Sequence, residues 1–298
     1  MYRIIQKSWW WFGFSIVLTI LAVIFLAVFG LRLGIDYRGG TVIELQTNNT
    51  NKTELIKKSL DELGYTGYQI KESGTNQAVI RLQSITNDEH KKLTEKMVSN
   101  LGEASETQYD SVGPTISKDL TRRSIYAVVL ASIGIILYVA YAFRKLPKQL
   151  SSWKFGVCAV GALVHDLLIT AGFVALLSHF FIWMEVDALF VTALLTIMGF
   201  SVHDTIVVYD RLRENFIKNP HEDISLIAEE SINQTLVRSI NTSMTTIIVL
   251  LALLIFGSQS IRHFIVTLTF GILIGTYSSI FNAVPLVVAW HKKATTTK

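Results

Sequence analysis

The stretch ALFVTALLTIMGFSVHDTIVV, residues 188–208, decides the class of fold. Its length is close to the roughly 20 mostly apolar residues that a helix needs to cross the hydrocarbon core of a bilayer. One carboxylate, Asp204, lies inside it, shortly after Gly199. The stretch therefore predicts a membrane-spanning helix that carries a polar patch.

Five further stretches approach or exceed the same length. They are residues 9–30, 125–143, 155–177, roughly 240–256, and 264–290. Hydrophobic residues make up 50% of the 298-residue chain, and its mean hydropathy is too high for an ordinary soluble domain of this size. We therefore expect a membrane all-α bundle of six transmembrane helices.

The first stretch could be read as a signal peptide because Arg3 and Lys7 precede it. However, its apolar run exceeds the roughly 7 to 15 residues of a signal-peptide core, and no convincing small-residue cleavage site follows. We expect residues 1–30 to form the first transmembrane helix with a short cytoplasmic amino end.

Lysine and arginine residues near the ends of the spans indicate the orientation, since they concentrate on the cytoplasmic side. The opposite side carries Arg262, with Glu185 and Asp187. This pattern predicts a multi-pass protein of the cell inner membrane, with both termini cytoplasmic and residues 31–123 exported. The basic residues on the predicted cytoplasmic side are Arg3, Lys7, Arg144, Lys145, Lys148, Lys154, Arg211, Arg213, Lys218, Lys292, Lys293 and Lys298.

The net charge of +4 does not indicate a nucleic-acid partner, because the basic residues stand beside apolar runs and form no single stripe. The only cysteine, Cys158, allows no intrachain disulfide and no zinc site of cysteine pairs. Two lone histidines in the spans, His165 and His203, do not make a metal site and are as consistent with packing as with a proton relay. We expect no metal and no cofactor.

Residues 31–123 show the order of an exported, ferredoxin-like α+β domain between the first and second spans. Alternating patterns predict strands, and helical spacing predicts two helices, in the order β-α-β-β-α-β. No set of nucleophile, base and orienting residue is visible, so we predict no enzyme activity. The predicted strands are 41–47, 67–72, 77–83 and 106–112, and the predicted helices are 53–63 and 88–101.

The remaining residues, 124–298, are expected to form a five-helix transmembrane bundle with a cytoplasmic loop at 209–230 and a cytoplasmic tail. Within the loop, residues 223–230 have the pattern of a short amphipathic helix. This helix either lies on the membrane surface, touches a partner, or simply re-enters the bundle.

Charges inside the hydrocarbon are the informative residues, because each costs about 2.5 to 3.5 kcal/mol or more at a helix centre. Asp204 lies in the fourth span, Asp166 lies in the third, and Arg238 precedes the fifth. The spacing of Asp204 and Arg238 from the charged residues of the predicted loop places both at a similar depth.

Polar residues surround these charges at helical spacing. Arg238, Thr242 and Thr245, with Asn241 alongside, form one face, and Ser201, Asp204 and Thr205 form a matching face. Two interpretations stay open. In one, Asp204 and Arg238 form a structural ion pair that fixes helix register. In the other, Asp204 belongs to a proton relay, in which burial favours the protonated form of its carboxyl group and the Arg238 guanidinium favours the ionised form.

Small residues in the spans fit a bundle that moves but do not establish one. Gly199 interrupts the fourth span, and Gly271 with Gly275 gives a small-xxx-small pattern in the sixth. Such a pattern is more typical of close helix packing than of a hinge.

Several motifs resemble the SecD/SecF family. GIDYRGGT, residues 34–41, is similar to the family's Asp-aromatic-x-Gly-Gly motif, carried here by Asp36, Arg38, Gly39 and Gly40. GFSVHDTIVV at 199–208, followed by DRLREN at 210–215, resembles its most recognisable signature. Further matches are HD at 165–166 with IT at 169–170, and RSINTS at 238–243 with TT at 245–246. His203 stands where many relatives have Asn. VGP at 112–114 is similar to a further part of the family pattern, but Ser117 and Asp119 replace the Gly and Glu expected after it.

The resemblance covers nearly the whole chain. It implies one half of a heterodimer with SecD, of the resistance-nodulation-division superfamily, which works with the SecYEG channel and uses the proton gradient to promote translocation of preproteins. It further implies that Asp204 and Arg238 act with an aspartate of SecD, with Asp166 in support. Membrane lipid is an expected partner, and the proton gradient, not a cofactor, is the expected energy source.

Two alternatives belong to other classes. A related proton-driven exporter of small molecules or lipids should need two halves in one chain or a homo-oligomer, and larger exported domains. A passive scaffold of the translocon should tolerate loss of the Asp204 carboxylate.

Overall fold

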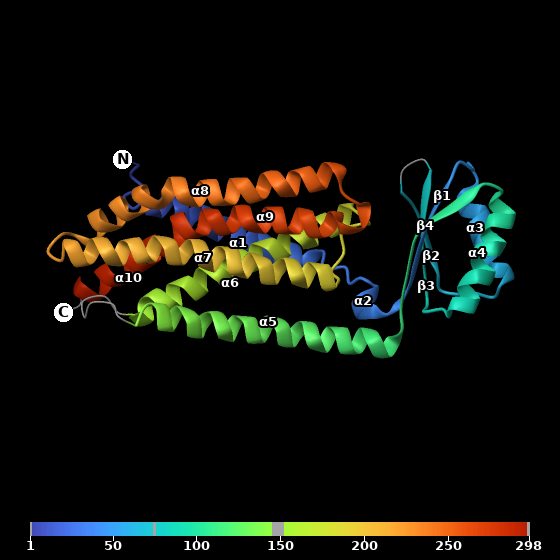
Figure 1. Ribbon diagram of the computed structural model, residues 1–298, viewed down its shortest axis with the longest axis horizontal. Helices are drawn as coiled ribbons and strands as arrows, with labels where there is room; N and C mark the ends of the chain where they lie inside the picture. Colours follow the sequence, from blue (N-terminus) through green and yellow to red (C-terminus); the bar gives the residue numbers. More distant parts are fainter. Residues whose placement is uncertain (1, 74–75, 145–151, 297–298) are drawn as a thin grey trace. The chain divides into compact units, whose positions relative to one another are not determined.

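Six helices in the described part of the chain are long and apolar enough to cross a membrane, which confirms the predicted six-span architecture. The computed structural model describes residues 2–73, 76–144 and 152–296. Lys145 and Lys148 of the predicted second connection, and Lys298 of the tail, lie outside these residues. The spanning helices are α1 (Ser8–Val28), α5 (Pro114–Ala142), α6 (Ser152–Phe180), α7 (Ala188–Lys218), α8 (Ile224–Phe256), and a composite sixth of η1 (Gln259–Ile261), α9 (Arg262–Ser278), the π-helical η2 (Ser279–Ala283) and α10 (Val284–Thr296) (Figure 1).

The chain divides into two compact units. One unit is Leu33–Ile125, and the other joins Met1–Arg32 to Tyr126–Lys298 and contains the spanning helices. The export of the smaller unit stays a prediction, as does the exact boundary of the exported segment.

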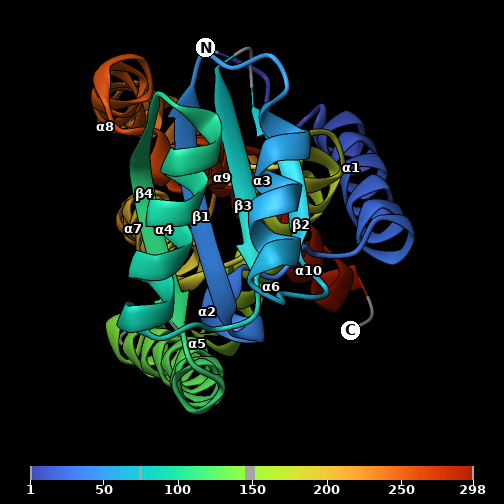
Figure 2. The same cartoon turned by 90° about the vertical axis from the view of Figure 1, so that its right-hand side faces the viewer.

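The smaller unit has a four-stranded antiparallel sheet with the strand order β2-β3-β1-β4. Helices α3 and α4 lie together on one face of this sheet (Figure 2), which confirms the ferredoxin-like prediction. After the short helix α2 (Ile35–Arg38), the order is β1 (Gly40–Thr47), α3 (Lys52–Glu62), β2 (Gln69–Ser73), β3 (Gln77–Leu82), α4 (Asn87–Leu101) and β4 (Ala104–Val112).

Local sequence explains how this unit folds. Alternate residues of β1, Ile43 and Leu45, point into a core that they share with Ile56 of α3 and Leu93 of α4. Helix α4 begins at a capping box. The Thr86 hydroxyl accepts a hydrogen bond from the backbone amide of Glu89, and the Glu89 carboxylate accepts one from the backbone amide of Thr86, so the start of the helix is fixed locally.

The core of the bundle is aromatic at one end. Phe143 and Phe155 pack against Tyr209, whose hydroxyl donates to the Ala283 carbonyl at 2.9 Å. Because Ala283 ends the π-helical turn η2, this bond ties α7 to the middle of the sixth span.

The predicted loop 209–230 is mostly helix. Helix α7 continues to Lys218 and α8 begins at Ile224, so only residues 219–223 connect them. Ile224 and Ile227 of the predicted amphipathic stretch are buried in the bundle core. This stretch is therefore the first part of a continuous re-entering helix. The end of the apolar run predicts where the span ends, whereas the helix continues as long as its backbone N–H and C=O groups remain hydrogen-bonded.

Candidate functional site

Asp166 of α6 is completely buried between three helices. Its Oδ2 accepts hydrogen bonds of 2.6 Å from Ser201 Oγ of α7 and of 2.6 Å from Ser278 Oγ of α9. His165 Nδ1 lies 2.9 Å from Oδ1. These partners satisfy a carboxylate that would otherwise be costly inside the hydrocarbon.

Gly275 makes this arrangement possible. A Cβ at its position would stand 3.2 Å from Ser201 Cβ and 3.8 Å from Asp166 Oδ2. At Gly271, one turn earlier, a Cβ would overlap the Ile197 side chain. The pair of glycines therefore allows close packing of α9 on α7, as the small-xxx-small pattern indicates.

A chain of polar contacts leads from His165 towards α1. His165 Nε2 lies 3.4 Å from Asn282 Nδ2, and Ser15 Oγ donates to Asn282 Oδ1 at 2.8 Å. Ser15 lies 3.1 Å from the Tyr277 hydroxyl, which donates to the carbonyl of Trp11 at 3.0 Å. Asn282 belongs to η2, and π-helical turns are frequent at functional sites.

The sequence did not predict four of these polar residues, namely Ser15, Tyr277, Ser278 and Asn282. Serine and tyrosine hydroxyls are inexpensive in an apolar helix, so they do not stand out in sequence as charges do. The available signal was the spacing of Ser278 and Asn282, which recur at i and i+4 in the sixth span.

Asp204 has a looser environment than Asp166. It is 4% exposed, and within the described residues its carboxylate has one hydrogen bond, from Ser243 Oγ of α8 at 3.5 Å. His203 Nδ1 lies 3.7 Å from Oδ1. Ser243 Oγ also lies 2.5 Å from Thr276 Oγ1 of α9, so Asp204 adjoins a hydroxyl pair between two helices.

The predicted face around Asp204 is divided between two acids. Ser201, Asp204 and Thr205 are all buried, but Ser201 donates to Asp166. The third and fourth spans thus share one polar interior.

The structure does not bring Asp204 and Arg238 together as an ion pair. The Arg238 side chain is exposed and, among the described residues, has no carboxylate within 4.0 Å. The face of α8 that packs against α7 carries Ser239 and Ser243 instead. Successive side chains of a helix point about 100° apart, so Ser239 points towards α7 while Arg238 points away from it. The predicted depth of Arg238 did not determine this direction.

The predicted face on α8 is on the outside of the bundle. Asn241 and Thr245 are exposed, and Thr242 is half-buried. Thr242 and Thr245 donate to carbonyls of their own helix. On α7, the side chain of His203 is 61% exposed. We call Arg238, Asn241, Thr245 and His203 the outer polar stripe.

The glycine motif belongs to the smaller unit, where it turns the chain from α2 into β1. Gly39 has φ +71°, and Gly40 has φ +126° with the Leu82 carbonyl 2.9 Å from where a Cβ would stand. Asp36 and Arg38 lie in α2, directly before this turn. The glycines are thus required by backbone conformation.

Chemically, the bundle offers the buried carboxyl groups of Asp166 and Asp204, imidazole rings and hydroxyls, which can bind and pass protons. Within residues 2–73, 76–144 and 152–296, no group of three or more His, Cys, Asp or Glu side chains could hold a metal ion. The expectation of no cofactor stays a prediction.

Comparisons with known proteins agree with this architecture. Residues 92–293 match the family "Protein export membrane protein SecD/SecF, C-terminal", and residues 24–50 match the SecD/SecF GG motif. The chain is 43% identical to the protein translocase subunit SecF of Thermobaculum terrenum, covering 98% of this chain and 95% of that protein. It is 36% identical to SecDF of Bacillus subtilis, covering 96% of this chain and 37% of that protein.

A solved structure shows the same fold. The crystal structure of SecDF from Thermus thermophilus, described as a translocon-associated membrane protein, superposes with a TM-score of 0.83 at 33% identity. The match covers 98% of this chain, which spans 39% of the length of that SecDF chain.

A six-span bundle with a buried polar interior and one ferredoxin-like domain defines a multi-pass membrane protein, and the family match places it among protein export membrane proteins. This chain belongs to the SecD/SecF family of protein export membrane proteins, and the curated relatives that it matches over nearly their full length are SecF subunits.

Proposed function

We propose that this chain is one half of a SecD–SecF pair in the cell inner membrane and uses the proton gradient to promote preprotein translocation through SecYEG. The observation that carries the proposal is the position of Asp204. It lies buried next to a polar stripe that the isolated bundle leaves uncovered.

The outer polar stripe supports the pairing. Polar and charged side chains within a membrane almost always face other helices or water, because exposure to lipid is expensive. Arg238, Asn241 and Thr245 face away from their own bundle, so a second set of helices is needed to cover them. The SecDF relative of Bacillus subtilis is long enough to hold a second half, since this chain matches 37% of its length.

The looser surroundings of Asp204 support a role in proton binding. Asp166 has two hydroxyl donors at 2.6 Å, whereas Asp204 has one at 3.5 Å. A carboxylate with few fixed donors can change its protonation state at low structural cost. In the proposed cycle, Asp204 takes up and releases a proton, Arg238 stabilises the ionised form when the partner is present, and Asp166 holds the polar path together.

The energy available is sufficient for a conformational change. A proton that crosses about 200 mV releases roughly 4 to 5 kcal/mol. A two-state equilibrium needs about 5.5 kcal/mol to move from 1:99 to 99:1, so one proton is enough for a strong bias.

The test is export of a preprotein into inverted membrane vesicles, with and without a proton gradient, by Asp204→Asn protein. We expect the gradient-dependent part of export to fall to the level of vesicles that lack the chain, while the amount of protein and its co-purification with SecD stay normal. Asp204→Glu should retain part of the activity.

Asp210→Asn is a matched control on the same helix, since Asp210 pairs with Arg213 at 2.9 Å near the predicted cytoplasmic end. It should export normally. Undiminished gradient-dependent export by Asp204→Asn would instead identify the chain as a passive scaffold.

A further inference from the structure

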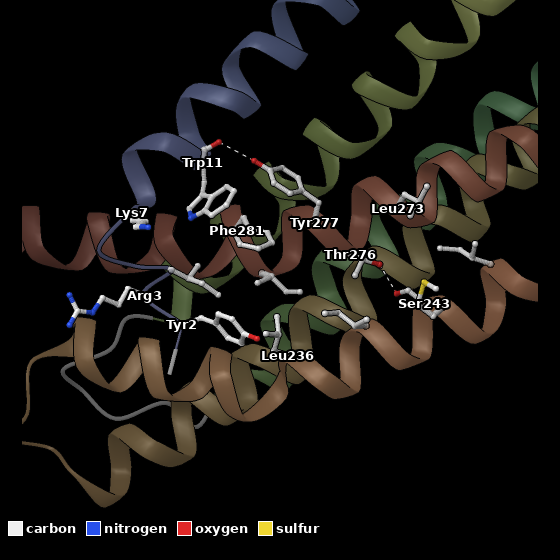
Figure 3. Close-up of a pocket in the computed structure, with 15 residues that line it drawn as sticks. Tyr2, Arg3, Lys7, Trp11, Leu236, Ser243, Leu273, Thr276, Tyr277 and Phe281 are labelled. Atoms are coloured by element: carbon white, nitrogen blue, oxygen red, sulfur yellow. Dashed lines mark hydrogen bonds between the residues drawn. The ribbon is translucent and has the colours of Figure 1, made fainter.

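A pocket of about 560 Å³ lies between the first residues of the chain, α8 and the sixth span (Figure 3). Its walls are apolar and aromatic, with Trp11, Phe281 and Tyr277 on one side and Leu236 and Ile240 of α8 on the other. All of its lining residues belong to the unit that contains the spanning helices.

The charges of this pocket have one sign and one location. Arg3 and Lys7 are the only charged residues that line it in the described part of the chain. Both are exposed and lie at one end of the pocket, whereas Ser243 and Thr276 lie at the other (Figure 3). The pocket thus joins a basic mouth to an apolar interior.

The basic mouth is held in place by backbone contacts. The amide of Tyr2 donates to Asn233 Oδ1 at 2.7 Å, and Asn233 Nδ2 donates to the Tyr2 carbonyl at 3.0 Å. The amides of Ile4 and Ile5 donate to the buried carboxylate of Glu229. These bonds fix Arg3 between anchored residues, so it is not part of a loose tail.

The pocket opens sideways. Ile240, Met244 and Leu273 line it and are 44%, 48% and 49% exposed, so the gap between α8 and α9 faces the outside of the bundle. Along α8 the lining extends from Leu236 to Ile247, which corresponds to about 16 Å of helix. In a multi-pass membrane protein this side faces lipid.

We propose that this pocket binds an anionic phospholipid, with its phosphate on Arg3 and Lys7 and an acyl chain along α8 and α9. Basic side chains at the membrane surface attract anionic headgroups, and tryptophan and tyrosine are typical of the same level. A groove with apolar walls and no carboxylate among its lining residues favours a lipid over water or a cationic ligand. The proposal does not depend on proton coupling.

The experiment uses the full chain in phosphatidylcholine nanodiscs that contain a titrated fraction of phosphatidylglycerol with a photoreactive acyl chain. After illumination, we expect adducts on peptides that cover residues 236–247 and 273–281. Arg3→Gln with Lys7→Gln should weaken the binding that these adducts report by about 10- to 30-fold. Met244→Trp should reduce the adducts by filling the groove while the headgroup contacts remain.

Lys218→Gln is the matched control, because Lys218 is a basic residue at the end of α7 that does not line the pocket. It should leave the adducts unchanged. Equal adducts from photoreactive phosphatidylcholine, together with no effect of the double substitution, would identify ordinary surrounding lipid and overturn the proposal. Rapid modification of Ile240→Cys by a membrane-impermeant thiol reagent would also overturn it, by showing a water-filled pocket.

Discussion

At the scale of single residues, Asp166 shows how a charge is accommodated inside the bundle. Two hydroxyls at 2.6 Å and an imidazole at 2.9 Å converge on one carboxyl group from three elements. Both serine hydroxyls donate to Oδ2, so removal of either leaves this buried oxygen with one donor in place of two, and each serine should contribute measurably to stability.

Ser278→Ala should lower the stability of the bundle by about 1 kcal/mol and at most about 3 kcal/mol. Heating in detergent with a thiol-reactive dye measures this, since the single cysteine, Cys158, is 5% exposed and reacts when the bundle opens. Thr192→Ala is the control, because Thr192 is exposed and bonds only to its own helix in the described structure. An equal midpoint for both variants would show that Ser278 adds no stability.

Sequence alone identified Asp166 and Asp204 as intramembrane acids, but most of the polar residues around them were not predicted. Asp166 and Asp204 stand out because a carboxylate in an apolar run is rare. Ser278 and Asn282 of the sixth span lie far along the chain from Asp166 and His165, and only the fold brings Ser278 to the carboxyl group, Asn282 to the imidazole and Ser15 to Asn282. The rotation of α8, which separates Arg238 from Asp204, is likewise set by packing and not by spacing.

At the scale of helices, packing between α1 and α6 depends on one glycine. A Cβ at Gly172 would lie 2.5 Å from Ala22 Cα, a backbone atom that cannot move without moving α1. The contact is therefore a close approach of two backbones, which small residues permit in membranes.

Gly172→Ala should destabilise the bundle by about 1 to 3 kcal/mol, because α1 must shift to admit the methyl group. Gly161→Ala on the same helix should be neutral or slightly stabilising, since nothing lies within 4 Å of its Cβ position and alanine favours a helix. Thermal midpoints of the two variants measure the difference. A Gly172→Ala midpoint at or above that of Gly161→Ala would refute the close-contact argument.

Helix limits were the least predictable feature of the elements. Hydropathy located all six spans, yet α7 and α8 run well beyond their apolar parts. Ion pairs such as Arg213 with Asp210, three residues apart, suit a helix in water as well as one in a membrane. The membrane-spanning part of a helix is therefore shorter than the helix itself, and hydropathy predicts only the spanning part.

At the scale of the molecule, the bundle buries its helices unequally. In the most apolar 18-residue part of each helix, α5 is 6% buried and α1 is 11% buried, whereas the corresponding part of α6 is 44% buried. Under the proposed pairing with SecD, the polar residues on the outside of α7 and α8 would face helices of the other chain.

Thr245→Trp should abolish pairing with SecD if the outer polar stripe is the contact surface, because a bulky side chain separates two packed helices. Ile20→Trp, on an exposed part of α1, is the control and should pair normally. Co-purification with tagged SecD, at matched protein levels, measures the effect. Normal recovery of SecD by Thr245→Trp would place the contact on another face.

The anchoring of the first residues on Glu229 and Asn233 sets an order of events during synthesis. The amides of Tyr2, Ile4 and Ile5 bond to side chains that are made more than 220 residues later. A chain that grows from its amino end at about 5 to 20 residues per second holds these amides unbound for roughly ten seconds or longer. The start of the protein therefore reaches its final position only after α8 has emerged.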